Sequence, residues 1–555
     1  MRRIALWMFL ACVLCCCGAG SAATAPAGEA LRGRPNILLI LADDLGYSDL
    51  GCYGSGVRTP NLDRLAAEGV RFSQFYNAAR CCPTRASLLT GLYPHQAGVG
   101  HMLQNWHPPS YTSGIGEDTA TLAEALRTGG YSSYHVGKWH VGGVGAAVGR
   151  NHPLNRGFAH AYGTGGGGNY FAPQPLYRDR EAVRPEGDYY VTDAFSEWAA
   201  RYLRDHRTSA PDRPFFLNLC YTAPHFPLHA RTEDINRYLG TFRRGWDHER
   251  AVRFARQRQL GLVRPEWTLS HRDPVAQPWS KIRDETAIAE WDRRMAVHAA
   301  MIDRMDQGIG HVLSALRETG QEKNTLVLFL SDNGASAEAL DSWPNPARGH
   351  RPGAVVGAAD SHRCLEIGWA NAANTPFREN KMWVHEGGIS TPLIAHWPGH
   401  VRNPGSVVGS VGHIIDLMPT FLDAAGLGYP AMLGGRSLRP LEGTSLLPAL
   451  RGRSLGPRRL GWEHEGNRAY RDGDWKVVAT HRGHWELYDL AADRTETQDL
   501  ATRMPERTRE MAAAWQKWAE RVGVVPWETL PGSSYRPAPG YRRKSEPPLS
   551  TAAPM

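Results

Sequence analysis

Residues 36–46 read Asn-Ile-Leu-Leu-Ile-Leu-Ala-Asp-Asp-Leu-Gly, and this stretch decides the fold class. Every residue from 37 to 42 is apolar, which is typical of a parallel strand that is buried on both faces. The run ends at Asp43 and Asp44, adjacent carboxylates whose burial costs free energy unless a positive partner meets them. Aspartates in this context also cap helices or lie in exposed loops, so a metal-binding role and a capping role both stay open from this stretch alone.

Further apolar segments continue the same pattern along the chain. Strand-like runs occupy residues 70–76, 131–140, 214–221, 325–330 and 390–396, and the last of these resembles the final strand of the main sheet. Helical signals lie between them, including a capping box at 121–124 and apolar residues at helical spacing over 291–316. This alternation predicts an α/β fold with a large doubly wound, mostly parallel sheet, helices on both faces, and a site at the carboxyl ends of the strands.

The pattern of polar and apolar residues changes near residue 455. The segments 470–479 and 485–490 alternate around turns, as in an antiparallel sheet, and a helix with Met511, Trp515 and Trp518 on one face follows. We therefore expect a catalytic domain at 34–454 and a small C-terminal α+β domain at 455–530. A tail at 531–555, rich in proline, serine and arginine, is predicted to be disordered.

The first 23 residues have the pattern of a secretory signal peptide. A basic start and a short apolar run precede small residues, and the run is too short for an ordinary membrane span. We expect export to the periplasm or the extracellular space, with cleavage near Ala23. A lipoprotein anchor on Cys12 or Cys17 stays possible, although neither cysteine has a clean lipobox.

The composition of the chain limits the classes of molecule that we expect it to bind. The formal net charge of +8 suits an anionic substrate, but no long basic run is present, so we expect neither nucleic-acid binding nor a membrane span. Five cysteines follow the signal peptide, namely Cys52, Cys81, Cys82, Cys220 and Cys364. This odd and sparse set does not form a disulfide framework.

A second informative stretch is Cys81-Cys82-Pro83-Thr84-Arg85, followed by Ala-Ser-Leu-Leu-Thr-Gly91. Pro83 suits the first position of a helix and Gly91 suits its end, so Cys81 is expected just before a helix N-terminus. Unpaired amides and the helix dipole favour an anion at that place, and Arg85 reaches back toward it. A buried, inert thiol at a helix cap is the plain alternative.

The spacing Cys-x-Pro-x-Arg, continuing into Leu-Thr-Gly, resembles the signature of the sulfatase family. The resemblance runs from residue 36 to about residue 527 and includes further motifs in the family's order. These motifs are Ala42-Asp43-Asp44-Leu-Gly46, Gly137-Lys138-Trp-His140, Ala223-Pro-His225, Ser331-Asp332-Asn333-Gly334 and Lys381 through Glu386-Gly-Gly388. Other segments look like arylsulfatase-type members of the alkaline-phosphatase-like superfamily.

The resemblance implies a sulfuric ester hydrolase with a specific cofactor chemistry. In the family, the cysteine matching Cys81 is oxidised to formylglycine by a formylglycine-generating enzyme, and the hydrate of formylglycine is the nucleophile. The ligand positions for calcium match Asp43, Asp44, Asp332 and Asn333, together with modified Cys81. Carboxylate and amide oxygens form a hard cage that suits calcium, with magnesium as the less favoured ion.

The resemblance also implies roles for the basic residues. Lys138, Lys381 and Arg85 would neutralise the sulfuryl oxygens. His225 matches the position that contacts sulfate and protonates the leaving oxygen, and His140 matches the position that serves the formylglycine hydroxyl. Considered singly, each of these residues could instead be a surface lysine or a satisfied loop histidine.

Two other functions compete with the hydrolysis of an aryl or carbohydrate sulfate. A phosphoesterase of the same superfamily could share the cage, and a catalytically dead glycan-binding protein could share the fold. Because all expected ligands and charges are present, the second of these has little support. The glycines at 165–168 lack the ending of a phosphate loop and are expected to form a flexible loop.

Several segments and residues carry no assigned role. Residues 340–375 are expected to form a long loop near the pocket, and residues 229–284 are polar with only weak periodicity. Cys82, His362, His385 and His413 match no role that we can name.

Overall fold

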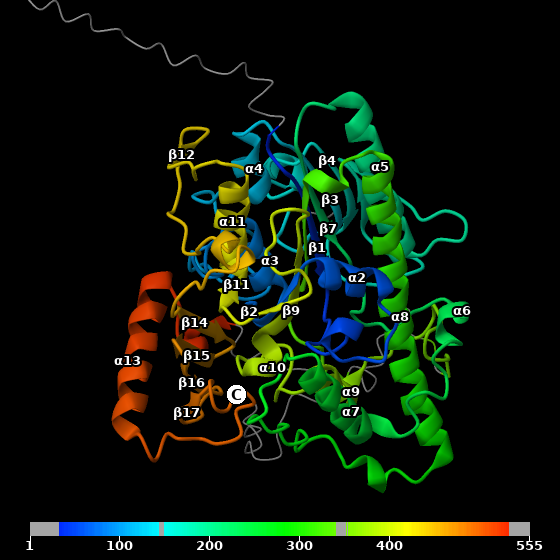
Figure 1. Cartoon of the computed structure of the whole chain (residues 1–555), viewed down its shortest axis with the longest axis vertical. Helices are drawn as coiled ribbons and strands as arrows, with labels where there is room; N and C mark the ends of the chain where they lie inside the picture. The colour runs from blue at the N-terminus through cyan, green and yellow to red at the C-terminus, as the bar shows by residue number, and fades with distance from the viewer. Residues whose placement is uncertain (1–32, 144–148, 340–350, 352, 532–555) are drawn as a thin grey trace, which may run out of the picture.

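A central mixed sheet forms the body of the molecule (Figure 1). The structure is a computed structural model that describes residues 33–143, 149–339, 351 and 353–531. Within this part of the chain the sheet has eleven strands, in the order β10-β2-β9-β8-β1-β7-β3-β4-β5-β6, and β11 also pairs with β2. The strands are β1 (Asn36–Ala42), β2 (Val70–Tyr76), β3 (Ser132–Lys138), β4 (His160–Thr164), β5 (Leu176–Arg178), β6 (Glu181–Val183), β7 (Phe215–Cys220), β8 (Thr325–Ser331), β9 (Ser390–His396), β10 (Val407–Val408) and β11 (Gly412–His413).

The opening apolar run becomes the central strand β1. It pairs in parallel with β7 on one side and β8 on the other, so that Leu39 lies opposite Asn218 and Leu328. Alternate residues of β1 enter two different cores, because successive side chains point to opposite faces of a sheet. Leu38 and Ile40 belong to one core, whereas Ile37, Leu39 and Leu41 belong to the other. A strand that must fill two cores has no polar face, which explains the unbroken apolar run.

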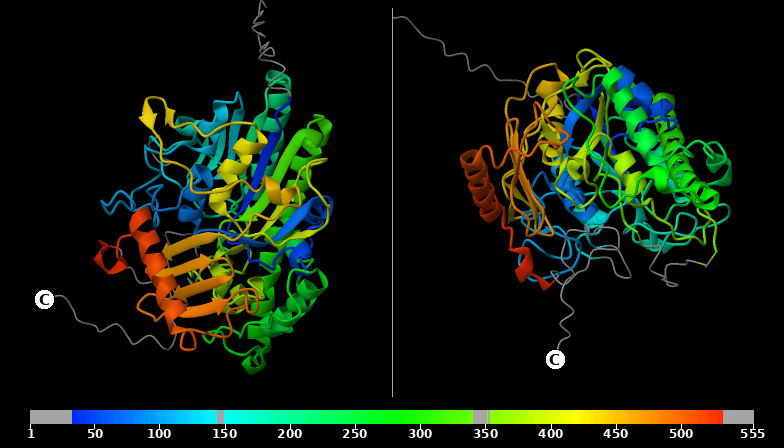
Figure 2. Two further views of the ribbon diagram at one scale, coloured as in Figure 1. Left: turned by 60° about the vertical axis from the view of Figure 1, so that its left-hand side comes forward. Right: turned by 90° about the horizontal axis from the view of Figure 1, so that it is seen from below.

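Helices cover both faces of the sheet, as Figures 1 and 2 show. One face carries α2 (Pro60–Glu68), α5 (Val191–Ser209) and the long α8 (Glu285–Glu318), which packs along α5. The other face carries α3 (Cys81–Thr90), α4 (Leu122–Arg127), α11 (Leu417–Ala424) and the short α12 (Leu447–Leu450). The predicted doubly wound α/β fold is thus confirmed, and β3, β4, β7, β1 and β8 form its parallel centre.

Antiparallel strands flank this parallel centre. β9 lies between β2 and β8 and is antiparallel to both of them. The prediction that 390–396 forms the final strand was therefore wrong, because the short strands β10 and β11 follow it and pair with β2. At the opposite edge, β4, β5 and β6 form an antiparallel meander. A small hairpin of β12 (Met432–Leu433) and β13 (Arg436–Ser437) stands apart from the main sheet.

Two stretches without clear periodicity contain helices. Residues 229–284 form α6 (Thr232–Ile235) and α7 (Gly245–Gln259), and α7 packs against α9 (Glu366–Ala373). Helix α9 lies near the end of the segment 340–375, which was expected to be a loop. Residues 340–350 and 352 of that segment lie outside the described residues. Helix α3 begins at Cys81, two residues earlier than predicted, because a proline is tolerated throughout the first turn of a helix, where an N–H group would have no intrahelical partner.

The C-terminal part is an antiparallel sheet of β14 (Arg459–His464), β15 (Asn467–Asp472), β16 (Trp475–Ala479) and β17 (Glu486–Asp489). Helix α13 (Pro505–Val522) covers it through Met511, Trp515 and Trp518, as Figure 2 shows on its left. This sheet joins the larger part through buried charges at α10 (Glu386–Ile389). Lys476 Nζ lies 3.0 Å from Glu386 and 2.7 Å from Glu496.

Two predictions concern segments that lie almost entirely outside the described residues. The signal peptide at 1–23 and the tail from 532 onward lie outside the described residues. Within the residues that are described, no helix combines the length and the apolar composition needed to cross a lipid bilayer.

Candidate active site

The candidate site lies where the carboxyl ends of the central strands meet the start of helix α3. Asp43 and Asp44 follow β1, Asp332 and Asn333 follow β8, and Lys138 ends β3. Parallel neighbours end at the same edge of a sheet, so these segments converge although up to 290 residues separate them. The structure thus brings together all the residues that the sequence placed at the site: Asp43, Asp44, Cys81, Arg85, Lys138, His140, His225, Asp332, Asn333 and Lys381.

Four oxygen-bearing side chains form a compact cage. The Asp44 amide lies 3.3 Å from Asp332 Oδ1, and Asn333 Nδ2 donates to Asp44 Oδ1 at 2.7 Å. Asp44 itself has a left-handed backbone conformation, with φ of 64°. Asp43 Oδ1 and Asn333 Oδ1 are buried and have no hydrogen-bond partner among the described residues.

The cage has the donor set of a hard-cation site. Its members offer carboxylate and amide oxygens, which are the ligands that Ca²⁺ and Mg²⁺ prefer. Buried oxygens without a partner cost free energy, and a bound cation would satisfy both Asp43 Oδ1 and Asn333 Oδ1. The residues present therefore fit a hard divalent cation.

Three basic side chains balance the three aspartates of the cage. Lys138 Nζ lies 2.5 Å from Asp43 Oδ2, and Lys381 Nζ lies 2.9 Å from both Asp44 oxygens. Arg85 donates to Asp332 Oδ2 from Nε at 3.0 Å and from Nη2 at 2.8 Å. All are buried, and one compensating charge for each acid makes this burial tolerable.

The pKa values reflect this pairing. Burial disfavours the charged forms, yet Lys138, His225 and Arg85 hold the pKa of Asp43 well below its usual range. The pKa of Asp332 lies well above its ordinary value because burial and the charge of Asp43 outweigh the effect of Arg85. A cation in the cage would favour the ionised form of these carboxyls.

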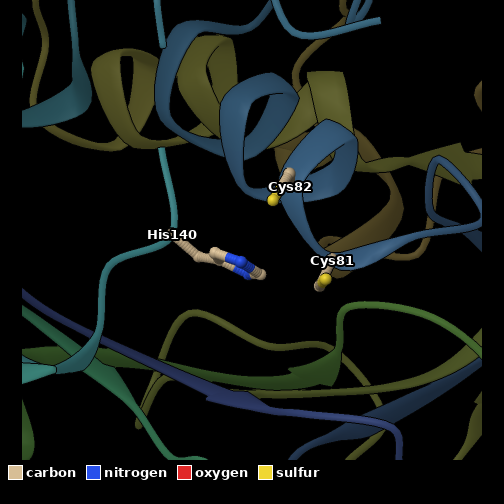
Figure 3. Close-up of side chains that lie close together, drawn as sticks. All are labelled: Cys81, Cys82 and His140. Atoms are coloured by element: carbon tan, nitrogen blue, oxygen red, sulfur yellow. The ribbon is translucent and has the colours of Figure 1, made fainter. Parts of the chain in front are cut away.

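Cys81 occupies the first turn of α3 and is buried at the edge of the cage. Figure 3 shows it beside Cys82 and His140, and the three possible ligand atoms lie within 4.8 Å of one another. A hydrogen bond from Cys82 and the nearby charge of Lys138 lower the pKa of the Cys81 thiol well below its ordinary value, despite burial. The local environment therefore stabilises negative charge at position 81.

The two histidines approach the cage from different elements. His225 follows β7, and its Nε2 lies 3.6 Å from Asp44 Oδ2 while Nδ1 lies 2.5 Å from the Phe226 carbonyl oxygen. His140 follows β3 with φ of 54°, and its amide donates to the Gly165 carbonyl at 3.1 Å. Burial lowers the pKa of His140, so the ring is neutral near pH 7 and can accept a proton.

Sequence reasoning missed three residues that border this site. Glu338 is buried, 3.8 Å from Lys381 and 3.9 Å from Arg80, and these cations with His225 lower its pKa against the effect of burial. Arg80 also lies 2.8 Å from Glu465, in the turn of the β14–β15 hairpin. Phe226 stacks on His225 with a centroid distance of 4.2 Å. Phe226 and Arg80 each adjoin a motif residue, and that adjacency was the available signal; Glu338 had none.

Histidines without an assigned role lie outside the cage. His413 is buried and caps a turn through the Ile415 amide, and His385 lies 3.6 Å from Glu486. His362 contacts Phe226 edge to face, with a centroid distance of 6.1 Å.

Comparison with known proteins matches most of this chain to sulfatases. The sequence profile of the sulfatase family matches residues 35–427, and the profile described as N-sulphoglucosamine sulphohydrolase, C-terminal, matches residues 378–517. An uncharacterized sulfatase of Schizosaccharomyces pombe is 33% identical over 539 residues, covering 90% of this chain and 95% of that protein. The arylsulfatase of Klebsiella aerogenes is 33% identical over 451 residues, covering 76% of this chain and 93% of that enzyme.

A solved structure extends the match to the fold. Ps i-CgsB, in complex with k-i-k-neocarrahexaose, superposes with a TM-score of 0.64 at 26% identity and covers 88% of this chain and 93% of its own. The second profile, which matches residues 378–517, spans the C-terminal antiparallel sheet. This chain belongs to the sulfatase family and is a sulfuric ester hydrolase.

Proposed function

We propose that this protein is an exported sulfatase that hydrolyses a sulfate monoester through formylglycine at position 81 and a calcium ion. The observation that carries this proposal is the place of Cys81, at the start of α3 between an all-oxygen cage and the Lys138 and Arg85 cations. The signal-like residues 1–23 support export to the periplasm or the extracellular space.

Asp43, Asp44, Asp332 and Asn333 would hold calcium, with the modified side chain at position 81 beside them. Calcium is preferred to magnesium because the cage offers several protein oxygens rather than space for a mostly hydrated ion. When bound, the cation would polarise the sulfuryl group and favour the ionised nucleophile. Formylglycine, as its hydrate, would supply a hydroxyl nucleophile where the chain carries a thiol.

The basic residues of this chain would bind and orient the sulfate group. Lys138 contacts Asp43, Lys381 contacts Asp44, and Arg85 contacts Asp332. As the sulfur–oxygen bond breaks, charge grows on the sulfuryl oxygens, and fixed cations in a buried site stabilise that charge strongly. These cations are also held by the cage, so they need not reorganise during the reaction.

The two histidines would move protons at different steps. His225 fixes Nδ1 against the Phe226 carbonyl, which leaves Nε2 on the cage side to protonate the departing alcohol oxygen. His140 is neutral and lies beside position 81, so it can take a proton from the hydroxyl there and allow inorganic sulfate to leave. The net reaction converts a sulfate ester and water to an alcohol and sulfate.

The substrate is proposed to be a sulfated carbohydrate, with aryl sulfates as surrogates. The structural relative Ps i-CgsB was solved with a carbohydrate, k-i-k-neocarrahexaose. Turnover of sulfated oligosaccharides of defined linkage, compared with 4-nitrophenyl sulfate and 4-nitrophenyl phosphate, tests the substrate class. A preference for phosphate would favour the phosphoesterase alternative.

Mass spectrometry of the peptide spanning position 81 tests the cofactor chemistry. Active protein should carry formylglycine there, and Cys81→Ala should fold but lose turnover, because the atom that forms the covalent bond is absent. Cys82→Ala is the matched control and should retain modification and most activity. Substantial activity in Cys81→Ala would refute the proposed nucleophile.

A further inference from the structure

The glycine-rich segment 165–168 runs beside both histidines of the site. It follows β4, the Gly165 carbonyl accepts the His140 amide, and a Cβ atom built on Gly166 would lie 3.7 Å from His140 Nε2. A Cβ atom built on Gly167 would lie 3.1 Å from both Cε1 and Nδ1 of His225. The segment, expected from the sequence to be only a flexible loop, thus contacts the side chain assigned here as proton donor.

Gly167 is needed for space and not for backbone conformation. Its φ lies outside the left-handed range in which a side chain is strained, and the residue is exposed. A contact of 3.1 Å is shorter than ordinary van der Waals contact, so a methyl group at this position requires the imidazole or the segment to move. The next residue, Gly168, has no atom within 4 Å of its Cβ position.

Phe226 confines the same imidazole. Its ring stacks on the His225 ring at 4.2 Å with an interplanar angle of 30°, and its carbonyl accepts the Nδ1 proton. The Phe226 ring also lies 5.6 Å from Lys381 Nζ, within the range of a cation–π contact. One residue therefore touches the proton donor and a cation of the sulfate site.

We propose that Gly167 and Phe226 are positioning residues, which together confine the His225 ring so that Nε2 faces the cage. The glycine leaves the ring room at its Nδ1–Cε1 edge, and Phe226 fixes the ring plane and the Nδ1 proton. This inference rests on the proposed role of His225. It adds that a side chain at position 167 would misplace the proton donor without touching the metal cage.

The test compares Gly167→Ala with Gly168→Ala as a matched control. The methyl group requires a shift of a few tenths of an ångström, and a misplacement of about 1 Å can cost about a hundred-fold, so kcat/KM of Gly167→Ala on a sugar sulfate should fall about three- to ten-fold. Gly168→Ala should stay within about two-fold, because its methyl group meets open space. Melting temperatures of both variants should match that of the parent enzyme. Equal activity of the two variants would overturn the proposal.

A double-mutant cycle separates this inference from the mechanism on which it rests. If Gly167 acts only through His225, Gly167→Ala should cause no further loss in a His225→Ala background, measured in single turnovers with a sugar sulfate, whose leaving group needs the proton. The same loss in both backgrounds would refute the positioning role. If the proton-donor role of His225 is wrong, the cycle still reports whether the two residues are coupled, because it measures only their dependence on each other.

Phe226→Leu provides a second, independent variant. It keeps the carbonyl that accepts the Nδ1 proton but removes the aromatic ring, so kcat should fall with little change in melting temperature. In a His225→Ala background, Phe226→Leu should lower kcat less. The loss that remains there would reflect the contact of Phe226 with Lys381. Unchanged kcat in Phe226→Leu would show that the ring does not confine the histidine.

Discussion

Each charged side chain of the site has a partner of opposite sign within hydrogen-bond distance. Asp43 has Lys138, Asp44 has Lys381, and Asp332 has Arg85. A divalent cation would add positive charge to this balanced set, and the resulting excess would attract a sulfate ester. The basic residues can therefore pair with the aspartates and, once the cation is bound, also attract an anionic substrate.

We expect Asp43→Asn to lose bound calcium and activity together, because the amide keeps the size of the side chain but removes its charge. Metal content by mass spectrometry and calcium titration by calorimetry measure the loss. Asp416→Asn is the control, since Asp416 is also a buried aspartate paired with an arginine, Arg458, but lies outside the cage. Both variants should lose stability, but only Asp43→Asn should lose calcium. Full calcium binding by Asp43→Asn would contradict the assignment.

We expect the effect of His225→Ala to depend on the leaving group. A sugar alkoxide needs a proton, whereas nitrophenolate departs with little help, and general acid catalysis contributes about a hundred- to ten-thousand-fold where the proton is needed. kcat/KM should therefore fall much more for a sugar sulfate than for 4-nitrophenyl sulfate, since it reports the steps through first bond cleavage. An equal loss on both substrates would mean that His225 only binds the sulfate group.

Motif spacing predicted the cage residues because each follows a recognisable strand. Asp43 and Asp332 end apolar runs, and the parallel sheet then brings them together. Glu338 and Glu465 could not be found in this way, since neither belongs to one of the motifs and their contacts depend on tertiary packing. When segments far apart in the sequence position a side chain, no local sequence pattern predicts where it lies.

At the scale of elements, helix α3 places Cys81 beside the cage. The sequence predicted its end correctly and its start less well. Gly91 ends the helix in the left-handed conformation, with φ of 69°, as the sequence predicted. The start was misplaced by two residues because Pro83 was read as the first helical residue and lies instead in the first turn. Helices α7 and α9 were missed because their mixed polar and aromatic residues obscure any period.

We expect Gly91→Ala to destabilise the protein by two effects. A left-handed conformation costs an alanine about 1 kcal/mol, and its Cβ would lie 2.8 Å from Met418 Cβ. Gly320→Ala is the matched control, with φ of 70° and no atom within 4 Å of the Cβ position. Chemical denaturation should show the larger loss for Gly91→Ala, and the difference between the two variants measures the packing cost. Equal losses would show that Met418 moves freely.

Across the whole molecule, the two sheets are joined by a buried ionic network rather than by apolar contact alone. Glu386 in α10 contacts Lys476 and Arg494, and Lys476 also contacts Glu496. Buried ion pairs add little net stability, but removal of one partner leaves an uncompensated charge. The network therefore favours one particular docking of the C-terminal sheet.

We expect Lys476→Met to destabilise the protein by about 3–5 kcal/mol, because it leaves Glu496 buried without its cation. Arg459→Met, in the same sheet, removes an exposed pair with Asp472 and should destabilise the protein far less, because solvent screens that pair. Urea denaturation compares the two variants. A small loss for Lys476→Met would show that water or rearrangement satisfies the remaining charge.

The same network gives the stability a pH dependence. Burial opposes ionisation of Glu386, but Lys476 and Arg494 lower its pKa from 4.5 to about 2. Its contribution is therefore complete above pH 4.5 and declines as the pH falls toward 2. In Lys476→Met this acid-dependent loss should be smaller and should be complete at a higher pH, because the pKa of Glu386 in the folded protein then lies closer to 4.5.

The burial of Cys81 constrains when the chain can be modified during its synthesis. Only 2% of this side chain is exposed in the folded protein, and the hairpin turn at Glu465 closes over the neighbouring Arg80. The ribosome makes Glu465 384 residues after Cys81 (465 − 81), which takes roughly 20 to 80 seconds at about 5–20 residues per second. If Cys81 is converted to formylglycine as proposed, the modifying enzyme has that interval, or the lifetime of the unfolded chain, in which to act. Under this proposal, faster folding would lower the fraction of molecules that become active.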